Sequence, residues 1–312
     1  MADAMVKVGN FVNGEVLDLA PEIALVSPTD TPLTTLLMGR GAVVPAKDIT
    51  VTWRERQLNS TRGTLKKEGA DAGDAITSSR SSLSNLCQII EKVTMVSGTA
   101  QALNPQGIGN SFDAEVKDRL VEAKRDLEWY FLNGTKTSES TSAPRQMGGL
   151  VNLVNSNNVI DATDKTLTED MLLDLLQKMW DHGAQGEYFC FVDATTKRLI
   201  NALGKSGTNF RFIDDASAGI GKAFGVSYNK FESDFGVLNM VLDRHMAPPS
   251  DGYPTFLAVD LEQVQIAELR PTFYEDLPKN GDYLKGHIIN ESTIKLLNSY
   301  AGAKIINLGK KS

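Results

Sequence analysis

The longest regular hydrophobic pattern in the chain lies between Ser111 and Leu132, where apolar residues recur at steps of three and four. This spacing places them along one side of a helix about 33 Å long, with charged residues on the other side. The stripe consists of Phe112, Val116, Leu120, Ala123, Leu127 and Tyr130 or Phe131. Opposite charges four residues apart, Glu115 with Arg119 and Lys124 with Glu128, predict two exposed ion pairs. We expect this helix to lie across a sheet, although a plain surface helix fits the same pattern.

Two strand-like segments precede the long helix. Residues 49–58 alternate, with Ile49, Val51 and Trp53 on one face, and residues 86–96 form a second candidate. The segment between them, 59–84, is polar and has almost nothing to place in a core. Two interpretations stay open for it, a mobile surface loop or a projecting hairpin that becomes ordered against a neighbouring subunit.

Strand and helix patterns alternate after residue 150. A capping box of Thr166 and Glu169 predicts a helix over 167–182, and the apolar run 188–192 predicts a buried strand. Asp193 can cap a second helix that ends at Gly204. Further strands are predicted at 226–228, 237–242, 256–259 and 264–269, and strands at 283–297 and 303–308 form a hairpin-like sheet that could accept the long helix.

The first 47 residues predict an arm instead of a domain, because their apolar residues are scattered among prolines. One short helix is expected there. Asp30 or Thr31 can cap it, Pro32 suits its first position, and Gly39 can end it.

Composition limits the classes of function. The chain has 312 residues, a net charge of −7 and a pI near 5.1. An acidic chain without long basic runs is a poor candidate for a broad nucleic-acid-binding face. Cys87 and Cys190 each lie in an apolar run, which predicts buried, reduced thiols. The amino terminus has no signal-peptide pattern and no window is apolar enough to span a membrane, so we expect a cytoplasmic product.

Motifs for catalysis have no support. Gly204-Lys205-Ser206 resembles the end of a phosphate-binding loop, but Leu199 stands where that motif needs glycine. The three histidines, His182, His245 and His287, lack the spacing of a helix-borne zinc pair, and no Gly-x-Ser-x-Gly elbow occurs. Asp161 with Asp164 and Asp214 with Asp215 fit solvated turns better than a cation site. We therefore predict no enzyme activity, no cofactor and no metal.

Seven segments carry a resemblance to a known family. They are SPTDTPLTTLLMG (27–39), VTWRERQL (51–58), QIIEKVTMVSGTAQAL (88–103), KRDLEWYFLNGT (124–135), RQMGGL (145–150), VDATTKRLI (192–200) and NGDYLKGHIINESTIKLLNSYAGA (280–303). Together they resemble the major capsid proteins of tailed bacteriophages. The resemblance implies an α+β fold with an N-terminal arm (1–47), an extended β-hairpin loop (48–97), a peripheral domain (98–150 and 276–312) containing a spine helix at 111–132, and an axial α/β domain (151–275).

The same resemblance implies a structural function. Such a protein self-assembles through hexamers and pentamers into an icosahedral or prolate head shell that encloses double-stranded DNA, which it touches only non-specifically. Its partners would be copies of itself, the portal protein and, where present, scaffolding and decoration proteins. It would be assembled in the host cytoplasm and located in the virion. Nothing identifies the Lys, Asn and Glu trio that cross-links some relatives, and the few residues before the arm predict no cleaved scaffolding segment.

Five charged residues of the predicted hairpin are candidates for contacts between subunits. They are Arg54, Arg56, Lys66, Lys67 and Glu68, each of which could equally be a solvated surface residue. Two alternatives to a phage shell stay open from the sequence. One is a cytoplasmic α/β enzyme with a flexible lid at 59–84, and the other is an encapsulin-like nanocompartment shell.

Overall fold

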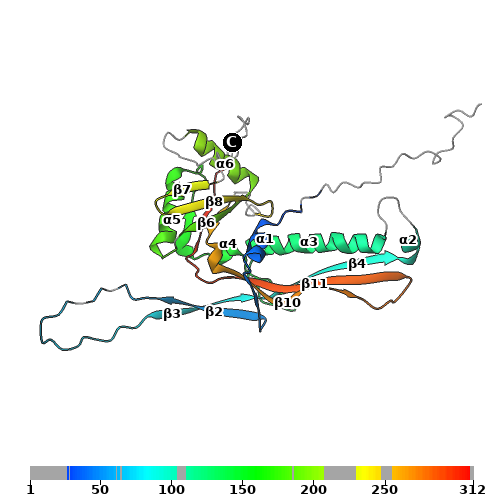
Figure 1. The fold of residues 1–312 in the computed structure, drawn as a ribbon, viewed down its shortest axis with the longest axis horizontal. Coiled ribbons are helices and arrows are strands. Elements are labelled where there is room, and N and C mark those ends of the chain that lie inside the picture. Colours follow the sequence, from blue (N-terminus) through cyan, green and yellow to red (C-terminus); the bar gives the residue numbers. More distant parts are fainter. Residues whose placement is uncertain are drawn as a thin grey trace, which may run out of the picture.

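The computed structural model describes residues 27, 29–60, 62–63, 65–103, 110–184, 186–206, 230–246 and 255–309. A long helix lies over one sheet, a second sheet with its own helices stands at one end of that helix, and a two-stranded hairpin projects from the body (Figure 1). The helices are α1 (Pro32–Gly39), α2 (Gly98–Ala102), α3 (Ser111–Asn133), α4 (Leu150–Leu153), α5 (Glu169–Asp181) and α6 (Ala194–Ser206), with 3-10 turns η2 (Ser156–Asn158) and η3 (Leu261–Gln263).

The long helix predicted from the hydrophobic stripe is confirmed as α3, which is capped by the side chain of Asn110. Its buried side includes Phe112, Ala123, Leu127 and Phe131, but Leu120 in the predicted stripe is 49% exposed. The exposed pair of Glu115 and Arg119 is present. The pair of Lys124 with Glu128 is a wrong prediction, because Glu128 is fully buried and bonds to α1 instead.

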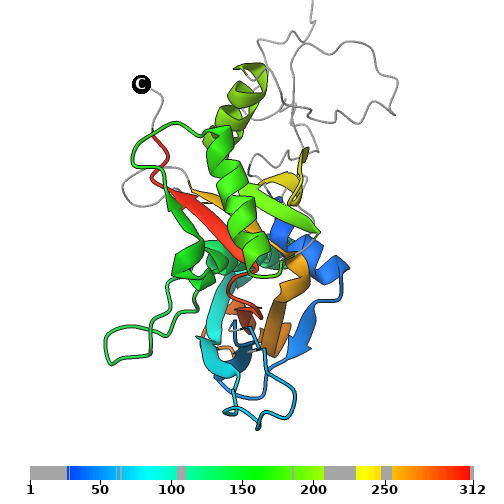
Figure 2. The same cartoon turned by 90° about the vertical axis from the view of Figure 1, so that its left-hand side faces the viewer.

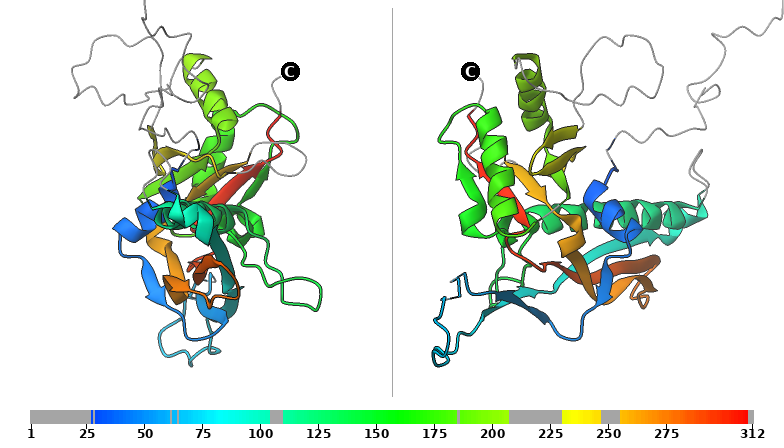
Figure 3. Two further views of the ribbon diagram at one scale, coloured as in Figure 1. Left: turned by 90° about the vertical axis from the view of Figure 1, so that its right-hand side faces the viewer. Right: turned by 60° about the vertical axis from the view of Figure 1, so that its left-hand side comes forward.

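α3 covers one face of a four-stranded sheet in the order β1-β10-β11-β4 (Figure 3). The strands are β1 (Val43–Pro45), β10 (Val264–Asp276), β11 (Tyr283–Leu296) and β4 (Gln88–Ser97). β10 and β11 form a long antiparallel ribbon, and β4 adds to β11. Along β4, buried residues alternate with exposed ones, because one side of the strand faces α3 and the other side faces away from it.

A six-stranded sheet in the order β5-β12-β9-β6-β8-β7 forms the second part of the molecule. Its strands are β5 (Val159–Asp161), β12 (Gly302–Ile306), β9 (Phe256–Val259), β6 (Glu187–Val192), β8 (Gly236–Leu242) and β7 (Lys230–Ser233). Figure 2 shows α5 lying across this sheet. One core of the molecule fills the space between α5 and the sheet, and a second core joins the other side of β6 and β9 to α1, α3 and the four-stranded sheet.

The local predictions for this second part are confirmed with small shifts. Asp193 caps α6, accepting the amide of Thr196 over 2.8 Å. The predicted capping box at Thr166 is wrong, because Thr168 is the cap and accepts the amide of Met171. α6 also continues past Gly204 to Ser206. The strand predicted at 226–228 and the pair Asp214 and Asp215 lie outside the described residues.

The two C-terminal strands separate, contrary to the prediction that they share a sheet. β11 is central to the four-stranded sheet under α3, whereas β12 lies in the six-stranded sheet between β5 and β9. The chain crosses between the sheets through the turn 297–301, and the amide of Leu297 bonds to the carbonyl of Gln263 over 2.8 Å.

The bounds of the arm helix and the burial of the cysteines agree with the sequence, but the predicted side-chain cap is wrong, because Thr31 makes no cap bond and the amides of Leu33 and Thr34 donate to Glu128. α1 begins at Pro32 and ends at Gly39, and its residues Leu33 and Leu37 are fully buried. Both cysteines are buried and free, and burial raises the pKa of the Cys87 thiol to about 11. Neither thiol is poised for nucleophilic chemistry, because the reactive form is the thiolate.

Candidate subunit interface

The projecting hairpin consists of β2 (Thr50–Gln57) and β3 (Ser79–Leu86), which form a separate two-stranded sheet. Their register runs from Thr50 opposite Leu86 to Gln57 opposite Ser79. The second hairpin strand therefore lies largely inside the polar segment 59–84 that the sequence left without a strand. The segment predicted as its partner, 86–96, is instead mostly β4 of the four-stranded sheet.

One face of β2 fastens the hairpin to the body. Trp53 donates its indole N–H to the carbonyl of Leu296 over 2.9 Å, and the carboxylate of Glu55 accepts the backbone amide of Ser299. A two-stranded hairpin is marginal in water by itself, so contacts of this kind decide its orientation. The alternation predicted for 49–58 is confirmed, since Val51, Trp53 and Glu55 are half-buried while the residues between them are exposed.

Asn85 fixes the base of the hairpin and was not recognised from the sequence. This residue is fully buried, and its amide nitrogen donates to the carbonyls of Gly148 and Ile294, each over 2.8 Å. Its side-chain oxygen accepts the amide of Gly148 over 2.8 Å. One side chain thus joins β3 to the loop before α4 and to β11. The only signal in the sequence was an amide residue beside a run of apolar residues.

The other face of the hairpin carries uncompensated positive charge. Arg54, Arg56 and Arg80 are exposed, and Arg56 lies directly opposite Arg80 in the register. Like charges at directly opposed positions destabilise a strand pair. Among the residues that the structure describes, none forms an ion pair with these three arginines. An acidic surface on another molecule would remove the repulsion.

The remaining predicted interface residues lie elsewhere on the hairpin. Lys66, Lys67 and Glu68 are exposed in the loop that joins β2 to β3, where the Lys66 ammonium contacts the carbonyl of Asp71. The structure therefore does not bring the five predicted residues together. It places Arg54 and Arg56 on the strand near the body and the other three in the loop.

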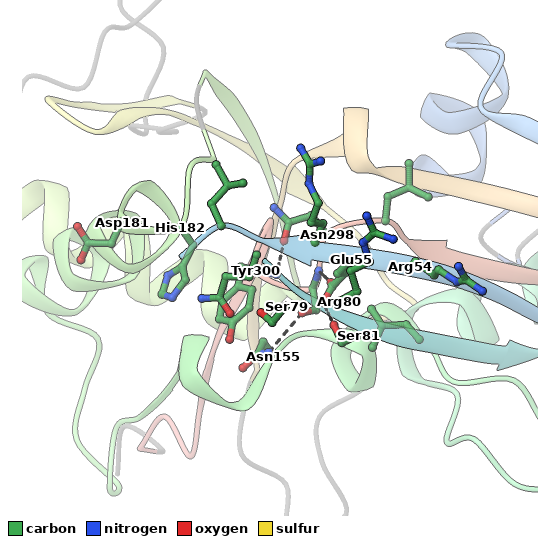
Figure 4. A pocket seen from close by; sticks show the side chains of 16 residues that line it. Arg54, Glu55, Ser79, Arg80, Ser81, Asn155, Asp181, His182, Asn298 and Tyr300 are labelled. Atoms are coloured by element: carbon green, nitrogen blue, oxygen red, sulfur yellow. Dashed lines mark hydrogen bonds between the residues drawn. The ribbon is translucent and has the colours of Figure 1, made fainter. Parts of the chain in front are cut away.

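A cleft of about 980 Å³ opens between the base of the hairpin, the turn 297–300 and the end of α5 (Figure 4). Arg54, Arg56 and Arg80 line its hairpin side. On the opposite side the ring of His182 stacks on Tyr300, with the ring centroids 4.1 Å apart. The Nδ1 atom of His182 also lies 2.9 Å from the carbonyl oxygen of Lys178, so this histidine is held as a structural element at the end of α5.

The four-stranded sheet leaves the face opposite α3 open. On β4 this face carries Ile89, Val93 and Met95, all exposed, with Met95 62% exposed. Between the apolar residues lie carboxylates: Glu91 Oε1 is 2.8 Å from His287 Nδ1, and Glu275 Oε2 is 3.5 Å from His287 Nε2. The face, which we call the open sheet face, therefore combines apolar and acidic side chains from β4, β10 and β11.

Charge is distributed unevenly between the hairpin and the rest of the chain. Residues 50–80 contain six Lys or Arg and four Asp or Glu, whereas the whole chain contains 32 and 39. The hairpin is thus net positive and the remainder carries all of the acidic excess. This asymmetry favours contact between the hairpin of one molecule and the body of another.

Comparison with known proteins identifies the family. The model of the SU10 major capsid protein family matches residues 7–309. The chain belongs to the SU10 major capsid protein family. A major capsid protein of Escherichia phage Phieco32 is 31% identical over 135 residues, an alignment that spans 43% of this chain and 37% of the relative. This SU10-family chain therefore matches well under half the length of that curated relative.

Solved structures show the same fold at low sequence identity. The capsid of cyanophage A-1(L) has a TM-score of 0.67 at 13% identity and covers 97% of this chain and 99% of that chain. The capsid of a native GTA particle has a TM-score of 0.66 at 10% identity, with 97% of each chain covered. The holo-SrpI encapsulin complex of Synechococcus elongatus has a TM-score of 0.58 at 12% identity over 93% of this chain and 94% of that chain. The SU10-family chain thus has the capsid fold that phage heads and an encapsulin share.

The described part of this SU10-family chain has neither a membrane-spanning helix nor a cluster of metal ligands. No helix there is both long and apolar enough to cross a membrane. No group of three or more His, Cys, Asp or Glu side chains is placed to hold a metal ion among those residues either.

Proposed function

We propose that this SU10-family protein is a structural subunit that self-assembles into the head shell of a tailed phage and encloses double-stranded DNA. The observation that carries the proposal is the projecting hairpin, with a net positive charge and three arginines that form no ion pair within the part of the chain that the structure describes. A hairpin that repels itself and extends away from its own body is stabilised by a neighbour, and family membership says which kind of assembly that neighbour belongs to.

The hairpin of one subunit, in this proposal, lies on the open sheet face of the next. The hairpin and the open face are on the same side of the molecule, away from α3 (Figures 1 and 3). Their surfaces are complementary, because Leu58, Leu65 and Ile76 are exposed on the hairpin and apolar and acidic residues lie on the face. The same contact repeated around an axis closes rings of five or six subunits.

The domain division follows the sheets, with changes from the predicted boundaries. We assign α3 and the four-stranded sheet to a peripheral domain and the six-stranded sheet with α5 and α6 to an axial domain. β10 (264–276) and β4 (88–97) then join the peripheral domain, and β12 (302–306) joins the axial domain. Residues 1–47 remain the arm, and the extended loop is restricted to the hairpin between residues 48 and 86.

Two alternatives from the sequence differ in their support. The α/β enzyme with a lid at 59–84 is not favoured, because this segment includes most of β3 and projects away from the body. A nanocompartment shell keeps one supporting observation, the fold shared with the SrpI encapsulin. The matching family model favours the phage shell. Portal, scaffolding and decoration proteins would be the further partners of such a shell.

Sedimentation velocity and negative-stain microscopy of the expressed full chain test this function. We expect capsomer rings or closed shells from the natural sequence, and small species from a chain carrying Arg54→Glu and Arg56→Glu. Lys117→Glu, a reversal of an exposed charge on α3, is the matched control and should leave assembly unchanged. A natural chain that stays a small soluble oligomer would overturn the proposal, and normal particles from the double variant would remove the two arginines from it.

A further inference from the structure

Two fully buried carboxyl groups meet at the root of the N-terminal arm. One is Glu128 on α3, which accepts the backbone amides of Leu33 over 2.6 Å and of Thr34 over 2.8 Å, as well as the hydroxyl of Thr34. These amides belong to the first turn of α1, where helical N–H groups have no partner within the helix. Thr31, at the cap position, supplies no side-chain hydrogen bond. A side chain from another helix therefore caps α1.

The second carboxyl group is Asp243, directly after β8. Its Oδ1 accepts the amide of His245 over 2.8 Å, and its own amide donates to Val192 over 2.9 Å. The side chain is also within hydrogen-bonding reach of Glu128. Its Oδ2 has no donor among the described residues. A carboxylate oxygen that faces another carboxylate is satisfied when one proton lies between them.

We propose that Glu128 and Asp243 share one proton, and that this proton is a pH-sensitive latch that seats α1 and thereby the root of the arm. The proton lies between Glu128, both oxygens of which accept bonds from α1, and Asp243 Oδ2, which has no other donor among the described residues. Loss of the proton leaves two buried anions in contact. Their repulsion displaces the turn after β8 or the first turn of α1, and either movement weakens the hydrogen bonds that hold α1 against α3.

The charged groups around the latch do not compensate a second negative charge. Arg244 forms an ion pair with Asp30, with Nε 3.0 Å from Oδ2, and both side chains are more than half exposed. His245 Nε2 lies 3.1 Å from the carbonyl oxygen of Asp30. On α3, Lys124 lies one turn before Glu128 and is exposed. Asp30 itself adds negative charge near Asp243.

The direction of the pKa shifts agrees with this geometry. Burial, together with the charge of Asp243, raises the pKa of Glu128 to about 7 against the lowering effect of the bonds from Thr34 and Leu33. Burial also raises the pKa of Asp243. Because the two groups interact strongly, the titration belongs to the pair. The latch therefore opens near neutral pH.

Hydrogen exchange of the full chain, in one assembly state, tests the latch. We expect the protection factors of the Leu33 and Thr34 amides in the natural protein to fall at least about tenfold between pH 6 and pH 8.5, the equivalent of one pKa unit. Asp243→Asn places a permanent N–H donor beside Glu128, so the protection factors of the Leu33 and Thr34 amides in this variant should stay constant over this pH range. Asp118→Asn, on the exposed side of α3, is the matched control and should behave like the natural protein.

Infrared spectroscopy adds a readout that does not depend on the variants folding. At pH 6 we expect the carbonyl stretch of a protonated carboxyl in the natural protein, which disappears as the pH rises past 8 and is absent from Asp243→Asn. No such band in the natural protein would overturn the proposal. A pH-dependent loss of protection that persists in Asp243→Asn would also overturn it. The inference does not rest on shell assembly, since both measurements read the subunit itself.

Discussion

The indole N–H of Trp53 in the projecting hairpin donates to the carbonyl oxygen of Leu296 at the end of β11, over 2.9 Å. This bond joins the hairpin to the strand that lies at the centre of the four-stranded sheet. It fixes which face of the hairpin turns inward and leaves Arg54, its neighbour on β2, on the outward face. The presentation of the arginines therefore depends on an anchor on the other side of the same strand.

Replacing Trp53 with phenylalanine should loosen the hairpin without removing most of its packing. The carbonyl of Leu296 loses its donor, which costs about 1 kcal/mol locally. We expect faster hydrogen exchange of amides 50–57, by about fivefold. Thr52→Ala, on the outward face of β2, is the control and should change exchange much less. Equal effects of the two changes would contradict the role of Trp53 as the anchor.

Gly149 should not tolerate a side chain, whereas its neighbour Gly148 should. A Cβ at Gly149 would lie 2.5 Å from the carbonyl oxygen of Leu132 and 2.6 Å from the amide of Gly134, both of which are backbone atoms. A Cβ at Gly148 would meet its nearest atom at 3.4 Å. We predict that Gly149→Ala lowers the free energy of unfolding by more than about 2 kcal/mol. Gly148→Ala should change it by less than about 1 kcal/mol, as measured by denaturant unfolding.

Glu291 should be a stabilising counter-charge of the four-stranded sheet. Its side chain is 5% exposed and pairs with Arg145 and, over 2.7 Å, with Arg270. Glu291→Gln leaves the mostly buried Arg145 short of a charged partner, so we expect a loss of about 2–3 kcal/mol in unfolding free energy. Glu139→Gln removes the exposed partner of the same arginine and should cost less than about 1 kcal/mol. Comparable losses in the two variants would contradict this assignment.

Stability should fall as pH rises towards neutrality because of Glu128. Burial raises the pKa of Glu128 from 4.5 to about 7, so the pair that it forms with Asp243 keeps a proton in the folded state that the unfolded state releases. Below pH 4.5 both states hold this proton and the contribution of Glu128 is complete. Between 4.5 and 7 the contribution is lost, by roughly 3 kcal/mol in total. The free energy of unfolding of Asp243→Asn, measured with denaturant, should depend less on pH over the same range than that of the natural protein. An equal dependence on pH in the two proteins would contradict the prediction.

Reversing charge on both proposed contact surfaces should restore assembly that either reversal alone impairs. Arg54→Glu with Arg56→Glu makes the hairpin acidic, and Glu91→Lys with Glu275→Lys makes the open sheet face basic. Each pair by itself juxtaposes like charges between subunits, whereas the quadruple variant restores opposite charges. Particle yield from sedimentation is the measurement. If the quadruple variant assembles no better than the two double variants, the hairpin does not lie on this face.

Local patterns in the sequence were sufficient for much of the fold. The stripe of α3, the apolar run of β6 and the cap of α6 at Asp193 are each determined within a few residues, and all are confirmed. The helix after Pro32 was predictable for the same reason. The family also followed from segments spread along the chain, and the match over residues 7–309 confirms it.

The rest depended on contacts between distant residues. β3, SRSSLSNL, has no hydrophobic pattern because it pairs with β2 alone and keeps most of its side chains in solvent. Glu128 looked like the partner of Lys124, and only the position of α1, almost a hundred residues away, makes it a buried cap. The assignment of β12 to a different sheet from β11 depends on a crossover that no local signal marks.

The central claim is that the projecting hairpin of each subunit packs on the open sheet face of a neighbouring subunit. A cryo-electron microscopy map of assembled particles of the full chain tests it most directly. We predict continuous density for the hairpin of one subunit over β4 and β11 of the next, with Arg54, Arg56 and Arg80 near acidic side chains. Particles in which the hairpin folds back onto its own body, or a chain that remains a compact monomer at high concentration, would contradict the account.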